Sequence, residues 1–320
     1  MGRYIIRRIL QAIPLLFLVS IFMFTLIHLM PGGPDQVLFN PHLSPASRAA
    51  MRARFGLDDP VPIQYLKWLG NALTGNFGFS FGTNQPVIQV LQERFPATLE
   101  LFVTGLTLAL ILAITLGTIS AVRQGTLTDY SLTIISYIGI CTPIFLFGLF
   151  AQYIFGVLLH WLPTSGMQTL GYTLDPFDAF IDHLQHLILP MLVLSITFIA
   201  GWSRYMRSSM IEVVKQDYMR TARAKGVGPI KQLIGHALRN AVIPLITVVA
   251  LDFGSVAGGA TITEGVFAWP GMGLLFFQSL EIRDYPVLLA MLMLGAVFVI
   301  GFNLIADILY AVMDPRIRYS

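Results

Sequence analysis

The chain alternates long, uncharged apolar runs with short polar segments. Three runs are long enough to cross a bilayer without interruption, at residues 9–30, 101–122 and 285–306. A spanning helix needs about 20 mostly apolar residues, because the hydrocarbon core is roughly 30 Å thick and a helix rises about 1.5 Å per residue. These runs are therefore predicted to be the first, second and sixth membrane helices.

Three further spans are predicted in less regular stretches. The third lies at about residues 132–159, where Pro143 is expected to introduce a kink. The fourth lies at about 187–205, and the fifth at 241–263 with Asp252 as its one charge. The pattern predicts an all-α polytopic membrane protein with six transmembrane helices.

The first apolar run also follows three arginines, as the core of a secretory signal peptide would. Its 22 uncharged residues exceed the 7–15 residues that are usual for such a core. The run ends in MPGGP, which is not a small-residue cleavage site. It is therefore interpreted as a retained first span.

Lys and Arg are distributed unevenly between the connecting segments. With the N-terminus inside, the inner segments hold 14 of the 20 basic residues, and these segments are 1–8, 123–129, 204–240 and 307–320. The outer segments hold six, five of them in the long segment 31–100, where the positive-inside rule is weak. Both termini are therefore predicted to be cytoplasmic.

The composition excludes several classes of protein. Hydrophobic residues make up 55% of the 320 positions and charged residues only 12%, where a soluble domain carries about 25% charged residues. An ordinary soluble enzyme, a disordered chain and a nucleic-acid binder are all excluded. The single cysteine, Cys141, rules out an intrachain disulfide and a multi-cysteine metal site.

The spans divide the chain into three parts. Residues 1–30 form an N-terminal segment with the first membrane helix, 31–100 an external cap, and 101–320 a core of five membrane helices that includes a cytoplasmic loop at 204–240. Short helices are predicted in the cap at 44–57, 60–73 and 89–95, around a Gly-rich aromatic loop at 75–86.

The role of the cap has two interpretations. It either shields the ends of the membrane helices or provides a docking surface for an outer partner. Its aromatic side chains give it more apolar surface than a bare linker needs, and they are Tyr65, Trp68, Phe77, Phe79 and Phe81.

The inner loop 204–240 carries eight Lys and Arg in 37 residues. Apolar residues at a spacing of three to four predict an amphipathic helix over 208–225, which Gly226 would end before a second helix begins near Pro229. The loop is either a basic surface beside anionic lipid or a mechanical connection to a cytosolic partner. Small residues at Ala222, Ala224 and Gly226 would let such a partner approach closely.

Sequence motifs for enzyme chemistry are absent or out of context. The chain has no G-x-x-x-x-G-K-[ST] and no Gly-Lys pair, so it cannot bind ATP through a P-loop of its own. One G-x-S-x-G occurs around Ser80, but no strand leads into it, so it is interpreted as a chance match. Asp182, His183 and His186 have a spacing that could meet a metal, but they are interpreted as polar residues at the outer mouth of a span. No catalytic residue, cofactor or metal site is predicted.

Asp252 falls near the bilayer midplane, eleven residues after Ala241. A carboxylate at that depth marks a transport pathway or is paired internally, for example with Asn303. The Gly254-x-x-x-Gly258 sequence that follows allows close helix packing. It has two interpretations: a simple contact between helices, or part of the pore wall or of the interface between subunits. The predicted pathway residues are Asp252, Ser255, Gly258 and Gly259.

Several sequence blocks resemble one protein family, in order and over nearly the whole chain. That family is the B-type permease subunits of bacterial dipeptide and oligopeptide ABC importers. The blocks are YIIRRILQAIPLLFLVSIFMF, MPGGP, PVPIQYLKWL, PATLEL, DHLQHLILPMLVLS, DYMRTARAKGVGPIKQLIGHALRNAVIPLI, TEGVFAWPGMG, RDYPV and DPRIRY.

The resemblance implies a type I ABC importer permease fold in the inner membrane and a transport system of five parts. The others are a second homologous permease, two cytosolic ATPase subunits that hold the enzymatic activity, and an external substrate-binding protein. The implied substrate is a peptide, or else glutathione, a nickel chelate or a haem-like compound. A self-sufficient ion-coupled channel or transporter is the alternative, and it would leave the basic inner loop without a role.

The inner loop aligns with the importer signature E-A-A-x-x-x-G. Arg220 and Thr221 replace the first two residues, and Ala222 and Gly226 keep their places. The resemblance implies that this loop seats in a cleft of the ATPase. The implied coupling residues are Tyr218, Arg220, Thr221, Ala222, Arg223, Ala224, Lys225 and Gly226.

Overall fold

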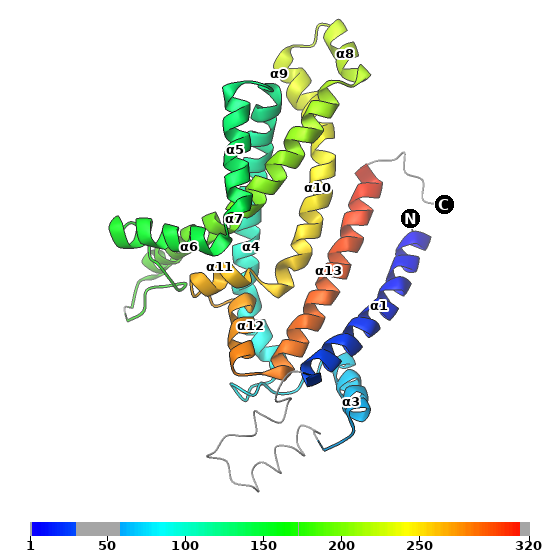
Figure 1. The fold of residues 1–320 in the computed structure, drawn as a ribbon, viewed down its shortest axis with the longest axis vertical. Helices are drawn as coiled ribbons and strands as arrows, with labels where there is room; N and C mark the ends of the chain where they lie inside the picture. The colour runs from blue at the N-terminus through cyan, green and yellow to red at the C-terminus, as the bar shows by residue number, and fades with distance from the viewer. Residues whose placement is uncertain (1, 30–57, 172, 314–320) are drawn as a thin grey trace. The chain divides into compact units, whose positions relative to one another are not determined.

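The computed structural model describes residues 2–29, 58–171 and 173–313 (Figure 1). Within these ranges the regular structure is helical, apart from one isolated antiparallel bridge between Phe79 and Pro86. The predicted all-α class is confirmed. The cap helix expected at 44–57, the MPGGP segment and the closing DPRIRY lie outside the described residues.

Among the described residues, five helices are long and apolar enough to cross a membrane. A sixth crossing is present if the bent pair Leu127–Cys141 and Ile144–Leu158 counts as one span. The five are Ile6–Leu29 within α1 (Gly2–Leu29), α4 (Val87–Val122), α7 (Pro176–Val214), Pro229–Val256 and Tyr285–Ile308 within α13 (Tyr285–Met313).

The third predicted span is broken rather than kinked. Helix α5 (Leu127–Cys141) ends at Thr142, and α6 (Ile144–Ala151) continues as the π-helix η2 (Gln152–Leu158) at an angle of 100° to α5. Proline disfavours helical geometry in the residue before it, and Thr142 is extended, with φ −87° and ψ 127°. The sequence identified the position of the break at Pro143 but not its size.

Helix α4 corrects the expectation of a separate short helix at 89–95. It runs unbroken for 36 residues through Pro96. Its first turns bury Val87, Val90 and Leu91 against Met272 of α12 (Met272–Glu281) and residues of α13. Tertiary packing therefore extends the helix across a proline that local preference would place at its boundary.

The inner loop also differs from the predicted single helix at 208–225. Helix α7 continues to Val214, and a break at Lys215 and Gln216 separates it from α8 (Asp217–Ala224). The chain then passes through α9 (Pro229–Lys231) and the π-helix η3 (Gln232–Leu238) into α10 (Arg239–Phe253). A 3₁₀ turn η4 (Gly254–Gly258) and α11 (Thr261–Val266) follow.

The chain forms two compact units. The first comprises Met1–Thr98, Ser255–Thr261 and Pro270–Ile300, and the second comprises Leu99–Gly254, Ile262–Trp269 and Gly301–Ser320. In the first, Tyr65 and Trp68 of α3 (Val61–Leu73) pack on Phe24 of α1 and on the start of α13. Helix α3 confirms the cap helix that was predicted at 60–73.

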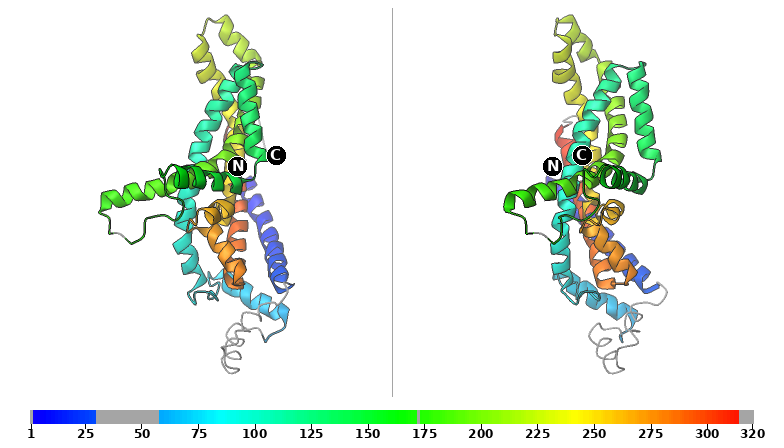
Figure 2. Two further views of the ribbon diagram at one scale, coloured as in Figure 1. Left: turned by 60° about the vertical axis from the view of Figure 1, so that its left-hand side comes forward. Right: turned by 90° about the vertical axis from the view of Figure 1, so that its left-hand side faces the viewer.

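In the second unit, α7 is the helix on which α5, α6 and α10 pack. Gly139 of α5 approaches Ala200 so closely that a Cβ on the glycine would lie 3.0 Å from the alanine Cβ. Farther toward the start of α7, Leu189 and Val193 pack with Phe267 and the apolar face of α6. The turn joining α4 to α5 and the α8–α9 segment lie at the same end of this unit (Figures 1 and 2).

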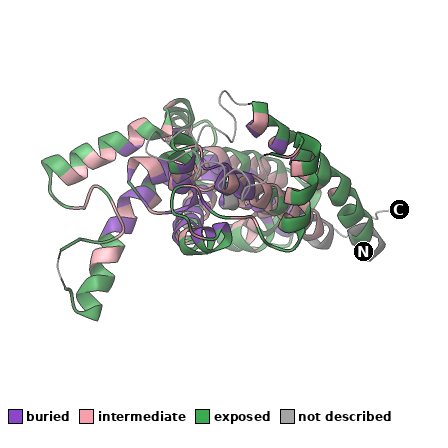
Figure 3. Ribbon diagram, turned by 90° about the horizontal axis from the view of Figure 1, so that it is seen from below, coloured by how far each residue is buried: buried purple, intermediate pink, exposed green. Residues whose placement is uncertain are grey.

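Large apolar side chains are exposed along many helices, and exposed residues are green in Figure 3. They include Ile6, Leu10 and Phe22 of α1, Ile134 and Ile135 of α5, and Phe150 of α6. Such surfaces are compatible with lipid, where apolar side chains need no cover from water. They agree with membrane helices whose apolar residues face outward.

Candidate functional site

The inner loop presents helix α8 as a short amphipathic element. Met219 and Ala222 are buried, whereas Arg220, Arg223 and Lys225 are exposed. Of the eight predicted coupling residues, Ala222 is the one that faces the protein interior. The remaining seven lie on accessible positions of α8 and its C-terminal turn.

Gly226 ends α8 in a Schellman motif. The amide of Val227 donates to the carbonyl of Ala222 over 3.2 Å, and the amide of Gly226 donates to Arg223 over 2.9 Å. This motif needs a left-handed residue, and Gly226 has φ +72°. A Cβ at this position would meet no atom within 4 Å, so the glycine is required for its backbone angle and not for space.

The loop is attached to the membrane helices that follow it. The side chain of Gln232 donates to the carbonyl of Val227, and Tyr218 hydrogen-bonds to the side chain of Asn240 on α10. Burial raises the pKa of the Tyr218 hydroxyl, and the hydrogen bond to Asn240 opposes that shift. The contact with Asn240 links α8 to the start of α10.

Asp252 accepts a hydrogen bond from a residue that was not predicted from the sequence. Its Oδ2 accepts from Nε1 of Trp202 on α7 over 2.7 Å. Trp202 is buried, and a buried indole N–H is stabilised by an acceptor. A tryptophan within the fourth apolar run was the available signal.

The other predicted pathway residues do not continue the helix of Asp252. Helix α10 ends at Phe253, and Gly254–Gly258 form the 3₁₀ turn. Gly259 then adopts a left-handed backbone conformation, with φ +74°. The expectation of a Gly254-x-x-x-Gly258 helix face is wrong, because these glycines terminate the helix instead of packing along it.

The G-x-S-x-G sequence has a structural role. The Ser80 hydroxyl donates to Oδ2 of Asp284, and the amide of Gly82 donates to the same oxygen over 3.1 Å. Ser80 and Asp284 are both buried. A Cβ on Gly82 would lie 2.4 Å from Cδ1 of Ile282. The motif therefore holds the 75–86 loop tightly against the turn between α12 and α13.

The polar residues at the start of α7 bond to neighbouring groups, and His186 bonds to Asp182 itself. Asp182 accepts from the amide and hydroxyl of Thr169, at 2.8 and 2.6 Å. Nε2 of His183 lies 2.6 Å from Glu100, and Nδ1 of His186 lies 2.8 Å from the Asp182 carbonyl. In the part of the chain that the structure describes, no three His, Cys, Asp or Glu residues are grouped to hold a metal.

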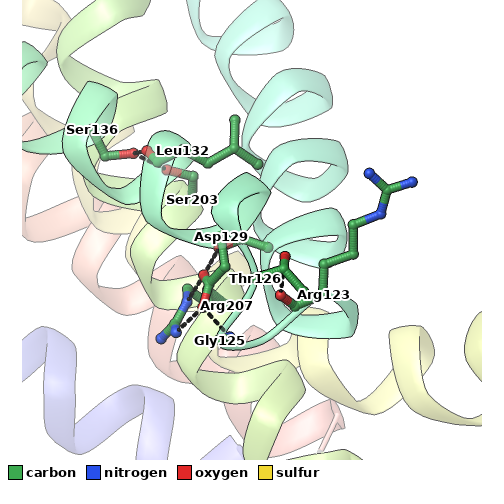
Figure 4. A network of polar contacts seen from close by, with 9 residues as sticks. Arg123, Gly125, Thr126, Asp129, Leu132, Ser136, Ser203 and Arg207 are labelled. Atoms are coloured by element: carbon green, nitrogen blue, oxygen red, sulfur yellow. Dashed lines mark hydrogen bonds and ion pairs between the residues drawn. The ribbon is translucent and has the colours of Figure 1, made fainter.

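An ion pair between the first turn of α5 and the last turns of α7 was also not predicted from the sequence (Figure 4). Nε and Nη2 of Arg207 donate to the two carboxylate oxygens of Asp129 at 2.7 and 2.8 Å. Asp129 is 2% exposed and also accepts from Ser120 and from the amide of Gly125. The signal in the sequence was an acid at the start of an uncharged stretch, where a charge needs a partner.

Two family models cover nearly the whole chain. Residues 113–319 match the binding-protein-dependent transport system inner membrane component, and residues 1–102 match the N-terminal part of such membrane components. The oligopeptide transport system permease protein AppB of Bacillus subtilis is 45% identical over the full length of both chains. The glutathione transport system permease protein GsiC of Escherichia coli is 39% identical over both full lengths. A dipeptide permease, DppB of Alkalihalophilus pseudofirmus, is 38% identical over 99% of each chain.

Proposed function

Because the chain belongs to the inner-membrane components of binding-protein-dependent transport systems, we propose that it is one of two permease subunits that form the pathway of an ABC importer for peptides. ATP hydrolysis on two separate cytosolic subunits powers uptake, and an external binding protein delivers the substrate. The chain itself is a multi-pass inner-membrane protein.

The observation that carries this proposal is the exposed basic loop around α8. A lipid-facing surface does not explain why α8 ends in a defined glycine motif and is bonded to the start of α10. A partner that binds α8 can displace α7 and α10 together, because α8 connects to one and contacts the other. A P-loop is absent from the sequence, so the nucleotide must be bound by that partner.

Peptides are the proposed substrate class because relatives of full-length similarity are named for oligopeptide and dipeptide transport. Glutathione is the second candidate, since a relative at 39% identity is named for it. Within this proposal, Asp252, Ser255, Gly258 and Gly259 contribute to the translocation pathway. Ser255 and Gly258 are exposed, which supports contact with a second permease or with substrate.

The outer cap is proposed to receive the binding protein. Of the five aromatic residues expected from the sequence, Tyr65, Trp68, Phe77 and Phe81 pack against the core of the first unit, whereas Phe79 is exposed. Helix α3 also exposes Leu66 and Leu73. Both leucines are candidates for the docking contact.

Reconstitution of the complete complex in proteoliposomes tests the function. Labelled dipeptide, oligopeptide and glutathione are supplied with the binding protein outside and ATP inside. The proposal expects uptake that requires both the binding protein and hydrolysable ATP. Uptake that follows an ion gradient and ignores ATP would instead establish the ion-coupled transporter.

A further inference from the structure

The Asp129 carboxylate joins three separate segments of the second unit. Ser120 belongs to α4, Gly125 to the turn between α4 and α5, and Arg207 to α7, and each donates to this carboxylate (Figure 4). Asp129 itself lies in the first turn of α5. The four segments are therefore held at one point.

The contact between Asp129 and Arg207 is geometrically specific. Two parallel N–H···O bonds at 2.7 and 2.8 Å fix the guanidinium plane against the carboxylate plane. The carboxylate is buried, so removing the arginine would leave a buried charge without its main partner. Small displacements of α7 against α5 are therefore opposed more strongly here than at an exposed ion pair.

Close helix packing continues this connection away from the inner face. The hydroxyls of Ser136 on α5 and Ser203 on α7 lie 3.2 Å apart, one turn of α7 before Arg207. On α4, a Cβ at Gly117 would lie 2.7 Å from the Ser203 carbonyl. The α4–α5 hairpin thus fits α7 closely along several turns, with the ion pair at the end nearest the inner loop.

Arg207 lies seven residues before Val214, where α7 ends, and α8 begins three residues later. A displacement of α8 therefore reaches Arg207 after about two helical turns. The α4–α5 turn and α8 lie at the same end of the unit (Figure 2). Through this pair α7 can carry the α4–α5 hairpin with it.

We propose that Asp129 and Arg207 are positioning residues for energy coupling, which make the α4–α5 hairpin follow α7 when an ATPase subunit displaces α8. The inference rests on the proposed function, because it requires a partner at α8. Neither residue contacts substrate or nucleotide in this mechanism. Their role is to convert a movement of one loop into a joint movement of three membrane helices.

The decisive measurement is the number of peptides transported per ATP hydrolysed by assembled complexes. A purely structural role would lower the amount of complex and leave this ratio unchanged. We expect Asp129→Asn to lower the ratio about fivefold or more, and Arg207→Lys, which keeps the charge but loses the paired geometry, to lower it less. Glu212→Gln is the matched control for charge, because Glu212 is exposed on α7 and its neutralisation leaves the Asp129–Arg207 pair in place.

A disulfide provides an independent rescue. In a Cys141→Ser background, Ser136→Cys and Ser203→Cys replace the hydroxyl contact between α5 and α7 with a covalent one. Oxidation is expected to restore the transport ratio of Asp129→Asn, and reduction to abolish the recovery. If the disulfide is shown to form and the transport ratio of Asp129→Asn still does not recover, the proposed coupling role of the pair is overturned.

Spin labels at Gln124 and Lys215, both exposed, report the link without transport. The label-to-label distance should stay narrow through the ATP cycle in the wild type and broaden in Asp129→Asn. A variant with an unchanged ratio and an equally narrow distance distribution overturns the inference while leaving the importer function intact. A wild-type complex that transports peptide without ATP hydrolysis would contradict the proposed function itself.

Discussion

The indole N–H of Trp202 on α7 donates a 2.7 Å hydrogen bond to Oδ2 of Asp252 on α10. The two residues are 50 positions apart and connect the two helices that flank the inner loop. The bond gives Asp252 a partner within this subunit. Internal pairing was one of the two interpretations of this acid, and a place in the transport pathway was the other. The same acid remains half-buried, so pairing and contact with the pathway are compatible.

Replacing Asp252 by Asn separates these two roles. If the acid contributes to the pathway, Asp252→Asn changes uptake rate or peptide preference while the amount of assembled complex stays nearly constant. Trp202→Phe serves as the comparison, because it removes the described donor and keeps the carboxylate. Equal losses of thermal stability in both variants, with uptake per complex unchanged, would assign the pair a structural role alone.

Substitution of Gly226 should uncouple the loop through its backbone. A left-handed angle costs a residue with a Cβ about 1–2 kcal/mol, so Gly226→Leu is expected to impair uptake with the complex still assembled. Gly228→Ala is the control, since Gly228 has φ −62° and open space around it. Labelled-peptide uptake measures both, and normal transport by Gly226→Leu would contradict the coupling role.

The 75–86 loop is stabilised by the buried hydroxyl of Ser80. Ser80→Ala removes a donor to the buried Asp284 carboxylate, and such a loss costs about 1–3 kcal/mol. We expect a lower unfolding temperature for the purified subunit. Thr83→Ala, which leaves the hydroxyl of Ser80 and its bond to Asp284 in place, is expected to have a smaller effect. A Ser80 that reacts with a serine-directed phosphonate would contradict the structural assignment.

The apolar runs predicted the membrane helices well where uninterrupted hydrophobicity alone determined the position of the helix. Uninterrupted runs located α1, the membrane part of α4 and α13, and the GVGP sequence located the turn after α8. Helix ends were predicted less well, because packing extends helices past local signals. Helix α7 continues beyond Arg204 since Met206 and Met210 are buried on one of its faces.

The polar contacts could not be derived from the sequence pattern. Asp129 and Arg207 are 78 residues apart, and Ser80 and Asp284 are 204 apart. Periodicity describes one helix at a time and holds no information about which helices meet. The acid at position 252 was found because it interrupts an apolar run, whereas its partner Trp202 is itself apolar enough to escape notice.

The break between α5 and α6 determines which face of the membrane the C-terminus reaches. At 15 residues, α5 is about 22 Å long, too short to cross alone, and α6 with η2 is no longer. If the two halves together make one passage, the described residues cross the membrane six times, an even number that places both ends of the described chain on one face. If the bent pair enters and leaves by the same face, the described residues cross five times and the two ends lie on opposite faces. A reporter enzyme that is active only in the cytoplasm can be fused to the C-terminus. Its activity would show on which face the C-terminus lies, and therefore whether the bent pair at Thr142–Pro143 crosses the membrane.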